Sequence, residues 1–221
     1  MELDHVLICS SYGAPEAARL ADLGLIEGVS NTHPGQGTAC RRFFFHNAYL
    51  ELLWVHNETE ARSEQVHATR LWGRWSGRGN GVCPVGFCFR PSGSQNTEPP
   101  FPTWQYRPSY LPEPLCIHIG ANVDQLTEPM LCYLSFAQRP DRYAPEKRAR
   151  MDHALGLSEI TRAEFVTPHA ESASRTLRAA MAEGSVHLRA GVEFLVELGF
   201  DGERQGQMAD CRPELPLVLC W

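Results

Sequence analysis

The chain has 221 residues, of which 43% are hydrophobic and 21% charged, and its formal net charge is −6. This length suffices for a buried core in one large domain or two small ones, and the composition is that of a soluble globular protein. The negative charge argues against a nucleic-acid partner, which would need clustered Lys and Arg. No apolar run reaches the roughly 18 residues that cross a bilayer, so no membrane partner is expected. The chain starts with a strand rather than a leader, which predicts a cytoplasmic protein.

Residues 1–56 predict the element order strand, helix, strand, strand, strand. Apolar residues alternate with few polar ones in the strands, and alanines recur at helical spacing after Pro15. The predicted elements are a strand over 3–9, a helix over 14–25, a glycine-rich loop or irregular strand over 28–38, and strands over 41–45 and 48–55.

Residues 57–158 predict a less regular part of the chain. Residues 57–81 form a connection with one helix, whose apolar face carries Leu71, Trp72 and Trp75. Residues 82–137 are rich in proline, and their composition predicts a long surface loop over 91–102. Residues 138–158 are charged and predict a helical connection. The short strands expected in the middle segment span 85–89, 103–106, 115–119 and 130–136.

From residue 159 the initial pattern returns. A strand over 160–166 is followed by a helix that opens at Thr167-Pro168 and ends at Gly184, and then by three strands over 186–189, 193–200 and 215–221. Such an internal repeat implies duplicated modules. We therefore expect a first βαβββ module over 1–56, a degenerate middle module over 82–137 and a final βαβββ module over 159–221, joined by connections over 57–81 and 138–158.

Two polar residues lie inside strands that are apolar on both faces. Because side chains alternate along a strand, His5 is expected to share a face with Leu3 and Leu7, and Glu51 with Tyr49. Strands that are apolar on both faces are covered on both faces. An unpaired carboxylate would cost several kcal/mol there. Glu51 must therefore be protonated, paired or bound to a metal.

The eight cysteines show no spacing typical of a zinc or redox site. They stand at positions 9, 40, 83, 88, 116, 132, 211 and 220, and several alternate with apolar residues. No two have the CxxC spacing. Reduced, buried core cysteines are expected.

Four stretches of the first module together resemble a known family. They are LDHVLIC at 3–9, NTHPGQGT at 31–38, RRFFF at 41–45 and YLELLWV at 49–55. The chain is similar in these stretches to glyoxalase-like domain proteins of the vicinal oxygen chelate superfamily. Beyond residue 57 the likeness is architectural, although residues 212–217 also fit. The resemblance implies an α+β fold, in which repeated βαβββ modules form curled mixed β-sheets with helices packed outside.

The resemblance also implies a metal site inside the cup formed by the curled sheets. In enzymes of the superfamily a divalent metal is held by residues of the first and last strands of the modules, and it chelates two neighbouring oxygens of the substrate. His5 and Glu51 fall on these positions. The final module departs from the pattern, with Arg162 near the first position. His118, itself also a candidate core histidine, would complete a three-ligand site suited to Fe, Mn, Ni or Zn.

Three interpretations of His5 and Glu51 stay open: metal ligands, a metal-free pair that binds or polarises a ligand or moves its protons, and a structural hydrogen-bonded pair. Three further residues are assigned to the predicted substrate pocket. His33 is a candidate to cover the pocket mouth, although it could be a plain loop residue. Arg42 is a candidate contact for an anionic substrate, and Tyr49 shares the face of Glu51.

Three functions follow from these alternatives. The leading hypothesis is a metal-dependent lyase, isomerase or dioxygenase that acts on a small molecule with vicinal oxygens, with His5 and Glu51 as catalytic residues. The alternative is a metal-free protein of the bleomycin-resistance type that binds a drug in the same cup. A third is a structural or regulatory domain that keeps only the fold. The superfamily also suggests a homodimer.

Overall fold

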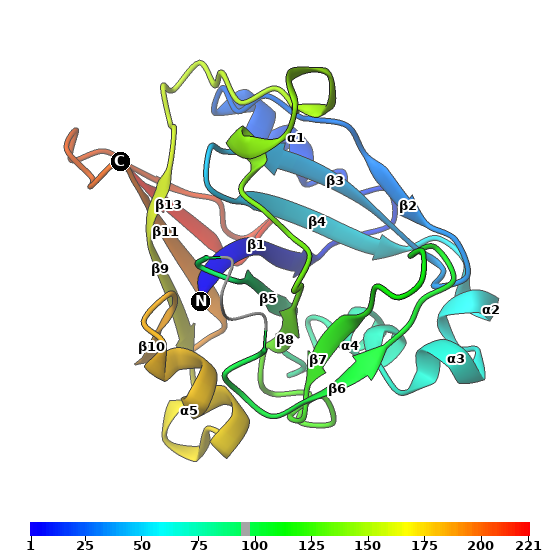
Figure 1. Ribbon diagram of the computed structural model, residues 1–221. Coiled ribbons are helices and arrows are strands. Elements are labelled where there is room, and N and C mark those ends of the chain that lie inside the picture. The colour runs from blue at the N-terminus through cyan, green and yellow to red at the C-terminus, as the bar shows by residue number, and fades with distance from the viewer. Residues whose placement is uncertain (94–97) are drawn as a thin grey trace.

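The computed structural model describes residues 1–93 and 98–221, and it contains an eight-stranded and a five-stranded mixed sheet (Figure 1). The described residues form five short α-helices, which pack outside the sheets. The expected α+β fold of curled mixed sheets is confirmed. Part of the loop expected over 91–102, residues 94–97, lies outside the described residues. Within the described ranges, no helix combines the length and apolar character that crossing a membrane requires.

The described residues form thirteen β-strands and five α-helices. The strands are β1 (Glu2–Cys9), β2 (Asn31–His33), β3 (Thr38–Phe44), β4 (Tyr49–Val55), β5 (Val85–Arg90), β6 (Thr103–Tyr106), β7 (Ile117–Gly120), β8 (Met130–Tyr133), β9 (Ile160–Thr167), β10 (His187–Ala190), β11 (Leu195–Phe200), β12 (Met208–Asp210) and β13 (Leu217–Cys220). The α-helices are α1 (Ala17–Asp22), α2 (Glu58–Ala61), α3 (Glu64–His67), α4 (Leu71–Gly77) and α5 (Arg175–Ala182).

The eight-stranded sheet is built from two units with the same strand pairing. Its order is β2-β3-β4-β1-β5-β8-β7-β6. The first unit consists of β1 to β4, and in it β1 pairs in parallel with β4. The middle unit consists of β5 to β8, and in it β5 pairs in parallel with β8. The two units join through the antiparallel pair of β1 and β5. They therefore form one continuous sheet, and β1 lies near its centre (Figure 1).

The final unit repeats the element order but not this strand pairing. Its sheet has the order β10-β9-β11-β13-β12. The first strand, β9, pairs in parallel with β10 and antiparallel with β11 rather than with the last strand. The short strand β12 was not predicted. Hydrophobic patterns identify strands, but they do not identify the partners of each strand.

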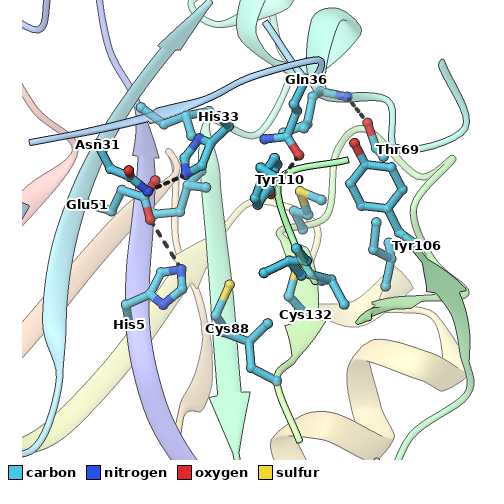
Figure 2. Close-up of a pocket in the computed structure, with 18 of the residues that line it drawn as sticks. His5, Asn31, His33, Gln36, Glu51, Thr69, Cys88, Tyr106, Tyr110 and Cys132 are labelled. Carbon is cyan, nitrogen blue, oxygen red and sulfur yellow. Dashed lines mark hydrogen bonds and ion pairs between the residues drawn. The ribbon is translucent and has the colours of Figure 1, made fainter. Parts of the chain in front are cut away.

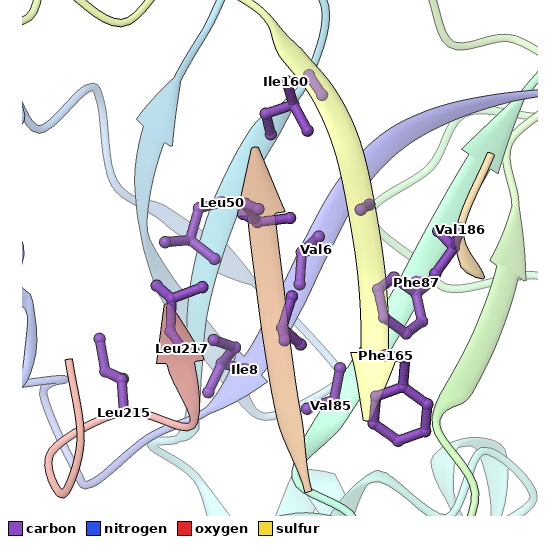
Figure 3. Packing of buried hydrophobic residues seen from close by; sticks show 14 of the residues in the cluster. Val6, Ile8, Leu50, Val85, Phe87, Ile160, Phe165, Val186, Leu215 and Leu217 are labelled. Carbon is purple, nitrogen blue, oxygen red and sulfur yellow. The ribbon is translucent and has the colours of Figure 1, made fainter. Parts of the chain in front are cut away.

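The two sheets pack face to face around the main hydrophobic core. Figure 3 shows Val6, Leu50 and Phe87 of the eight-stranded sheet against Phe165 and Leu217 of the five-stranded sheet. A second apolar cluster covers the other face of the eight-stranded sheet, next to α3 and α4. Both faces of β1 and β4 are thus covered, as their apolar sequences predict.

The structure has more helices than predicted, and helix α5 begins at a different residue. Residues 57–81 contain three short helices instead of one. In α4, the indole nitrogen of Trp75 donates a hydrogen bond to the carbonyl of Ser10, at 2.8 Å. Helix α5 begins at Arg175 because the hydroxyl of Ser174 accepts the N–H of Leu177 and caps the helix. The predicted start at Thr167 is therefore several residues too early.

The cysteines are buried thiols. All eight lie within the described residues, none of them forms a disulfide, and seven are buried. Burial raises the pKa of the Cys83 thiol to about 11. The expectation of reduced core cysteines is confirmed in this structure.

Residues 138–158 form no α-helix, in contrast to the prediction. They contain two 3-10 turns, Pro140–Arg142 and Pro145–Lys147. Pro145 lacks an N–H donor and its ring would clash with the preceding helical turn, so a helix cannot continue through it. His153 instead fixes the segment. Its Nδ1 accepts the N–H of Ile26 and its Nε2 donates to the carbonyl of Phe44, each at 2.9 Å.

These two bonds need a neutral imidazole, and they predict a dependence of stability on pH. Burial lowers the pKa of His153 below the ordinary value of 6.5, and the bond to Phe44 and the charge of Asp152 oppose this effect only in part. The unfolded chain binds the proton more readily. The contribution of His153 to the free energy of unfolding is therefore complete above the pKa that it has in the unfolded chain. It is lost as the pH falls through the lower pKa that it has in the folded protein.

We expect the free energy of unfolding of the wild type to fall between about pH 7 and about pH 5 more steeply than that of His153→Gln. The variant lacks the titrating ring but keeps a donor for the Phe44 carbonyl. Urea denaturation at several pH values measures both slopes. Equal slopes would contradict the role given to His153.

Candidate functional site

A cavity of about 460 Å³ opens on the face of the eight-stranded sheet that points away from the five-stranded sheet, and we call it the cup (Figure 2). This volume is within the range of about 300–1,000 Å³ that is usual for small-molecule sites. Side chains from both units of the sheet line it. Most are apolar or aromatic, and the polar ones are His5, Asn31, Thr32, His33, Gln36, Glu51 and Thr69.

An extra residue in β1 shapes the polar end of the cup. Leu3 lies opposite Phe89 of β5 and His5 lies opposite Cys88, so Asp4 has no partner in the ladder. This is a β-bulge, which interrupts the alternation of side chains. Leu3 consequently packs against the inter-sheet core instead of sharing the face of His5, as the regular alternation predicted. His5 shares the cup face with Leu7 as predicted.

The bulge places the Asp4 carboxylate beside the His5 ring. His5 Nδ1 lies 2.8 Å from Asp4 Oδ2, and both residues are buried, at 5% and 4% exposure. Arg90 balances the charge of Asp4: its Nη1 lies 3.4 Å from Asp4 Oδ1 and its Nη2 donates to Glu2 at 2.8 Å. The pairing with Asp4 leaves His5 Nε2 directed toward the cup.

Glu51 of β4 faces this second nitrogen. Its Oε2 lies 3.3 Å from His5 Nε2, longer than the roughly 2.7–2.9 Å of a charge-assisted hydrogen bond. Tyr49 stacks on the imidazole, with ring centroids 4.3 Å apart and planes inclined by 21°. Burial raises the pKa of Tyr49, and the charges of Asp4 and Glu51 add to the effect. The structure thus brings His5, Glu51 and Tyr49 together in the cup, and Figure 2 shows the contact between His5 and Glu51.

Two further donor atoms lie near Glu51. A ring nitrogen of His33, the Sγ of Cys40 and a carboxylate oxygen of Glu51 all lie within 4.8 Å of one another. Burial raises the pKa of the Cys40 thiol, and Glu51 adds to this shift. Burial also lowers the pKa of His33, against the opposing charge of Glu51. His33 is therefore neutral near pH 7, in the form that binds metals.

Sequence reasoning missed Asp4 and Cys40. Neighbouring residues in a strand point to opposite faces, so nothing in the alternation indicated that Asp4 reaches His5. Only the bulge brings them together. Cys40 lies on β3, next to the strand of Glu51, and pairs with Leu53 of the cup face. The predicted strand began at Arg41, so Cys40 lay just outside it, and its residue type suited a core position equally well.

The structure does not bring His118 to the other predicted ligands. Its neighbours Ile117 and Ile119 line the cup, whereas the His118 ring lies on the opposite face, with its centroid 6.2 Å from that of Tyr133. The alternation along β7 is regular, and it turns His118 away. The three-ligand site of His5, Glu51 and His118 is not formed.

Arg42 does not line the cup either. It pairs with Glu51 across β3 and β4, but its Nε donates to the carbonyl of Val29 at 2.9 Å. Its guanidinium carbon lies 5.1 Å from the centre of the Phe44 ring. The expected contact between Arg42 and an anionic substrate has no support in this arrangement.

A second group of possible ligands, His46, Asp141 and Glu159, lies outside the cup. Arg139 forms ion pairs with both of these carboxylates. A guanidinium already supplies the positive charge there, so this group is an ion-pair network rather than a metal site.

Two loops, one from each unit, meet over the cup. The hydroxyl of Tyr110 donates to Gln36 Oε1 at 3.1 Å, and Gln36 Nε2 donates to Thr38 Oγ1 at 2.7 Å. Thr38 Oγ1 in turn lies 2.9 Å from His33 Nδ1. This chain of hydrogen bonds fixes His33 in the lining of the cup, whereas the sequence suggested a position over the pocket mouth.

A carboxylate holds the loop that carries His33. Glu60 of α2 accepts the N–H groups of Gly35 and Gly37, at 2.8 and 3.1 Å. Gly37 has a φ of +74°, and a Cβ atom there would lie 2.3 Å from the carbonyl oxygen of Asn57. Glycine is thus required at this position by both conformation and space.

Two units of one curled sheet share the cup, in which His5 of β1 faces Glu51 of β4. A sequence model of the family described as "Glyoxalase-like domain" matches residues 3–181, and the chain belongs to this family. No curated protein matches the sequence.

Comparison with solved structures supports the fold. The crystal structure of a hypothetical protein from Staphylococcus aureus superposes with a TM-score of 0.52 at 8% sequence identity. The match covers 99% of this chain and 98% of that chain. The five-stranded sheet is therefore included in the similarity.

We expect Gly37→Ala to destabilise the protein more than Gly13→Ala. Gly13 has a similar φ of +77° but open space around it. Its substitution therefore lowers the free energy of unfolding only because alanine is strained in the left-handed conformation, by about 1–2 kcal/mol. Gly37→Ala adds the clash with Asn57, a further ~1–3 kcal/mol. Chemical denaturation compares the two, and equal losses would contradict the steric requirement.

Proposed function

We propose that the cup is the active site of a metal-dependent enzyme that acts on a small molecule with two neighbouring oxygens. His5 and Glu51 are the proposed metal ligands. The observation that carries the proposal is an imidazole with a buried carboxylate at each ring nitrogen, at the polar end of an otherwise apolar cavity.

The donor atoms fit a metal. Metal-binding histidines commonly donate their second N–H to a carboxylate, as the contact of His5 with Asp4 allows. Two ligands of a tetrahedral metal with bonds of about 2.0–2.1 Å stand roughly 3.3 Å apart. The observed separation of His5 Nε2 and Glu51 Oε2 is 3.3 Å. This is a poor hydrogen bond but a suitable ligand separation.

His33 and Cys40 are the candidates to complete the ligand set, because both lie near Glu51. Imidazole and carboxylate suit Fe, Mn, Ni or Zn, and participation of the Cys40 thiolate favours zinc over manganese. When bound, such a metal supplies Lewis-acid stabilisation of negative charge on the substrate oxygens. This chemistry is common to lyase, isomerase and dioxygenase reactions.

The residues of the chain have distinct proposed roles. Asp4 fixes the tautomer and orientation of His5, and Tyr49 restricts the rotation of its ring by stacking on it. The apolar wall excludes water from the polar end, which strengthens electrostatic interactions with a bound substrate.

A metal-free binding protein is the second candidate. The predominance of apolar and aromatic side chains in the cup favours it, as does the middle unit. Cys88 lies opposite His5 in the sheet and pairs with Cys132, and both line the cup. Among its described residues, the middle unit therefore contributes thiols to the cup lining and no histidine or carboxylate.

We expect protein purified without a histidine tag to bind one metal ion per chain, and His5→Ala and Glu51→Ala each to lose it. His118→Ala is the matched control, because this histidine lies on the opposite face of the sheet. Elemental analysis by mass spectrometry measures the metal. Metal-free wild type whose thermal stability does not respond to Fe, Mn, Ni or Zn would contradict the enzyme and favour the binding protein.

Asp4→Asn is expected to lower metal affinity by about 10–100-fold, because the carboxylate orients His5 and increases its basicity. Glu2→Gln is the control, since it removes the other carboxylate of Arg90 without touching His5. Competition with a chelator gives both affinities. An Asp4→Asn variant that is folded and binds metal as tightly as Glu2→Gln would show that Asp4 has no such role.

A further inference from the structure

We propose that the cup takes uncharged, largely apolar molecules that carry their oxygens at one end, and that it rejects anions. The oxygen-bearing end of this ligand class rests on the proposed function. The rejection of anions rests on the walls of the cup alone, and it is independent of a metal.

The charges around the cup are the first observation. Among the described residues, the lining contains no Lys or Arg. It does contain the carboxylate of Glu51, and Asp4 lies directly behind His5. At the apolar end of the cup, a carboxylate, phosphate or sulfonate on the ligand would find no side-chain cation to pair with, and it would lose its hydration in an apolar cavity.

Three arginines on the strands that form the cup or next to them are bonded elsewhere. Arg42 donates to Val29 and lies over Phe44. Arg107 follows β6 and is exposed, and it donates to the carbonyl of Pro114 at 3.0 Å and to Gln105 at 2.7 Å. Arg90 is held by Glu2 and Asp4 on the far side of His5. None of the three lines the cup.

The cup lining already holds a carboxylate. Among the described residues that line the cup, Glu51 is the one acidic side chain, and it is buried, at 5% exposure. Arg42 stands beside Glu51 across β3 and β4, but its guanidinium is bonded to Val29 and lies over Phe44. When no metal is bound, a second negative charge brought by a ligand would be repelled by the Glu51 carboxylate.

The cup is also divided into two ends. Figure 2 shows His5, Glu51, His33 and Asn31 on one side and Tyr106 on the other, where the uncharged polar side chains of Gln36 and Thr69 also lie. Burial raises the pKa of Tyr106 to about 12, so its phenol is neutral near pH 7. The remaining wall includes Leu111, Ile117, Ile119, Met130, Leu134 and Phe136. This division matches a molecule with oxygens at one end and an uncharged apolar body.

Two pairs of probes test the charge preference by titration calorimetry. The first pair is 4-tert-butylcatechol and 3,4-dihydroxybenzoate, which share the vicinal oxygens and differ in the charge at the far end. The second is 4-tert-butylphenol and 4-hydroxybenzoate, which lack the vicinal oxygens. We expect the uncharged member of each pair to bind at least about tenfold more tightly. Equal or tighter binding of the carboxylates, or binding of none of the four, would overturn the inference.

The same titrations keep this inference separate from the proposed function. A metal at His5 and Glu51 predicts that the wild type binds 4-tert-butylcatechol more tightly than 4-tert-butylphenol, and that His5→Ala removes the difference. If this difference is missing while the charge preference persists, the metal proposal fails and the inference stands.

A substitution that adds a cation tests the cause of the preference. Leu111 lies in the loop after Tyr110 and is half-buried, so a lysine there is compatible with the fold. Leu111→Lys is expected to bind 3,4-dihydroxybenzoate about tenfold more tightly than the matched control Leu111→Gln. Equal affinities of the two variants would show that the missing cation does not set the preference.

Discussion

The polar end of the cup depends on Asp4, the residue of β1 that has no partner in the ladder with β5. Without the bulge at Asp4, the carboxylate would point to the face opposite His5, into the core between the sheets. With it, Asp4 orients the imidazole, and Arg90 balances the buried charge. The distance between His5 and Glu51 follows from this local irregularity together with the parallel pairing of β1 and β4.

The same strand serves the core and the site. Val6 and Ile8 pack against the five-stranded sheet, while His5 and Leu7 face the cup. The packing of the two sheets therefore fixes the backbone on which the polar groups stand. Sites on such rigid elements hold their geometry more closely than sites on loops. The loop that carries His33 is the exception, and Glu60 compensates by clamping it.

Much of the fold, and half of the site, could be predicted from the sequence. Alternation placed His5 and Glu51 inside the sheet, and the repeated element order indicated the units. The same rule gave no signal for Asp4, because a bulge depends on pairing with β5. His118 was selected by residue type, yet the parity of its position along β7 turns it away from the cup. Tertiary contacts that local patterns do not encode decide the strand pairing in the final unit. They also decide the conformation of residues 138–158, which His153 holds in place by hydrogen bonds.

The match to the glyoxalase-like family indicates the fold of the chain but not its function. The function must be inferred from the side chains of the cup. The proposal that His5 and Glu51 share a metal ion is tested most directly by anomalous diffraction from crystals soaked with zinc or manganese. We expect a peak between His5 Nε2 and the Glu51 carboxylate, at about 2.0–2.2 Å from each. Density that shows the two side chains still in contact with each other and no peak between them would contradict it.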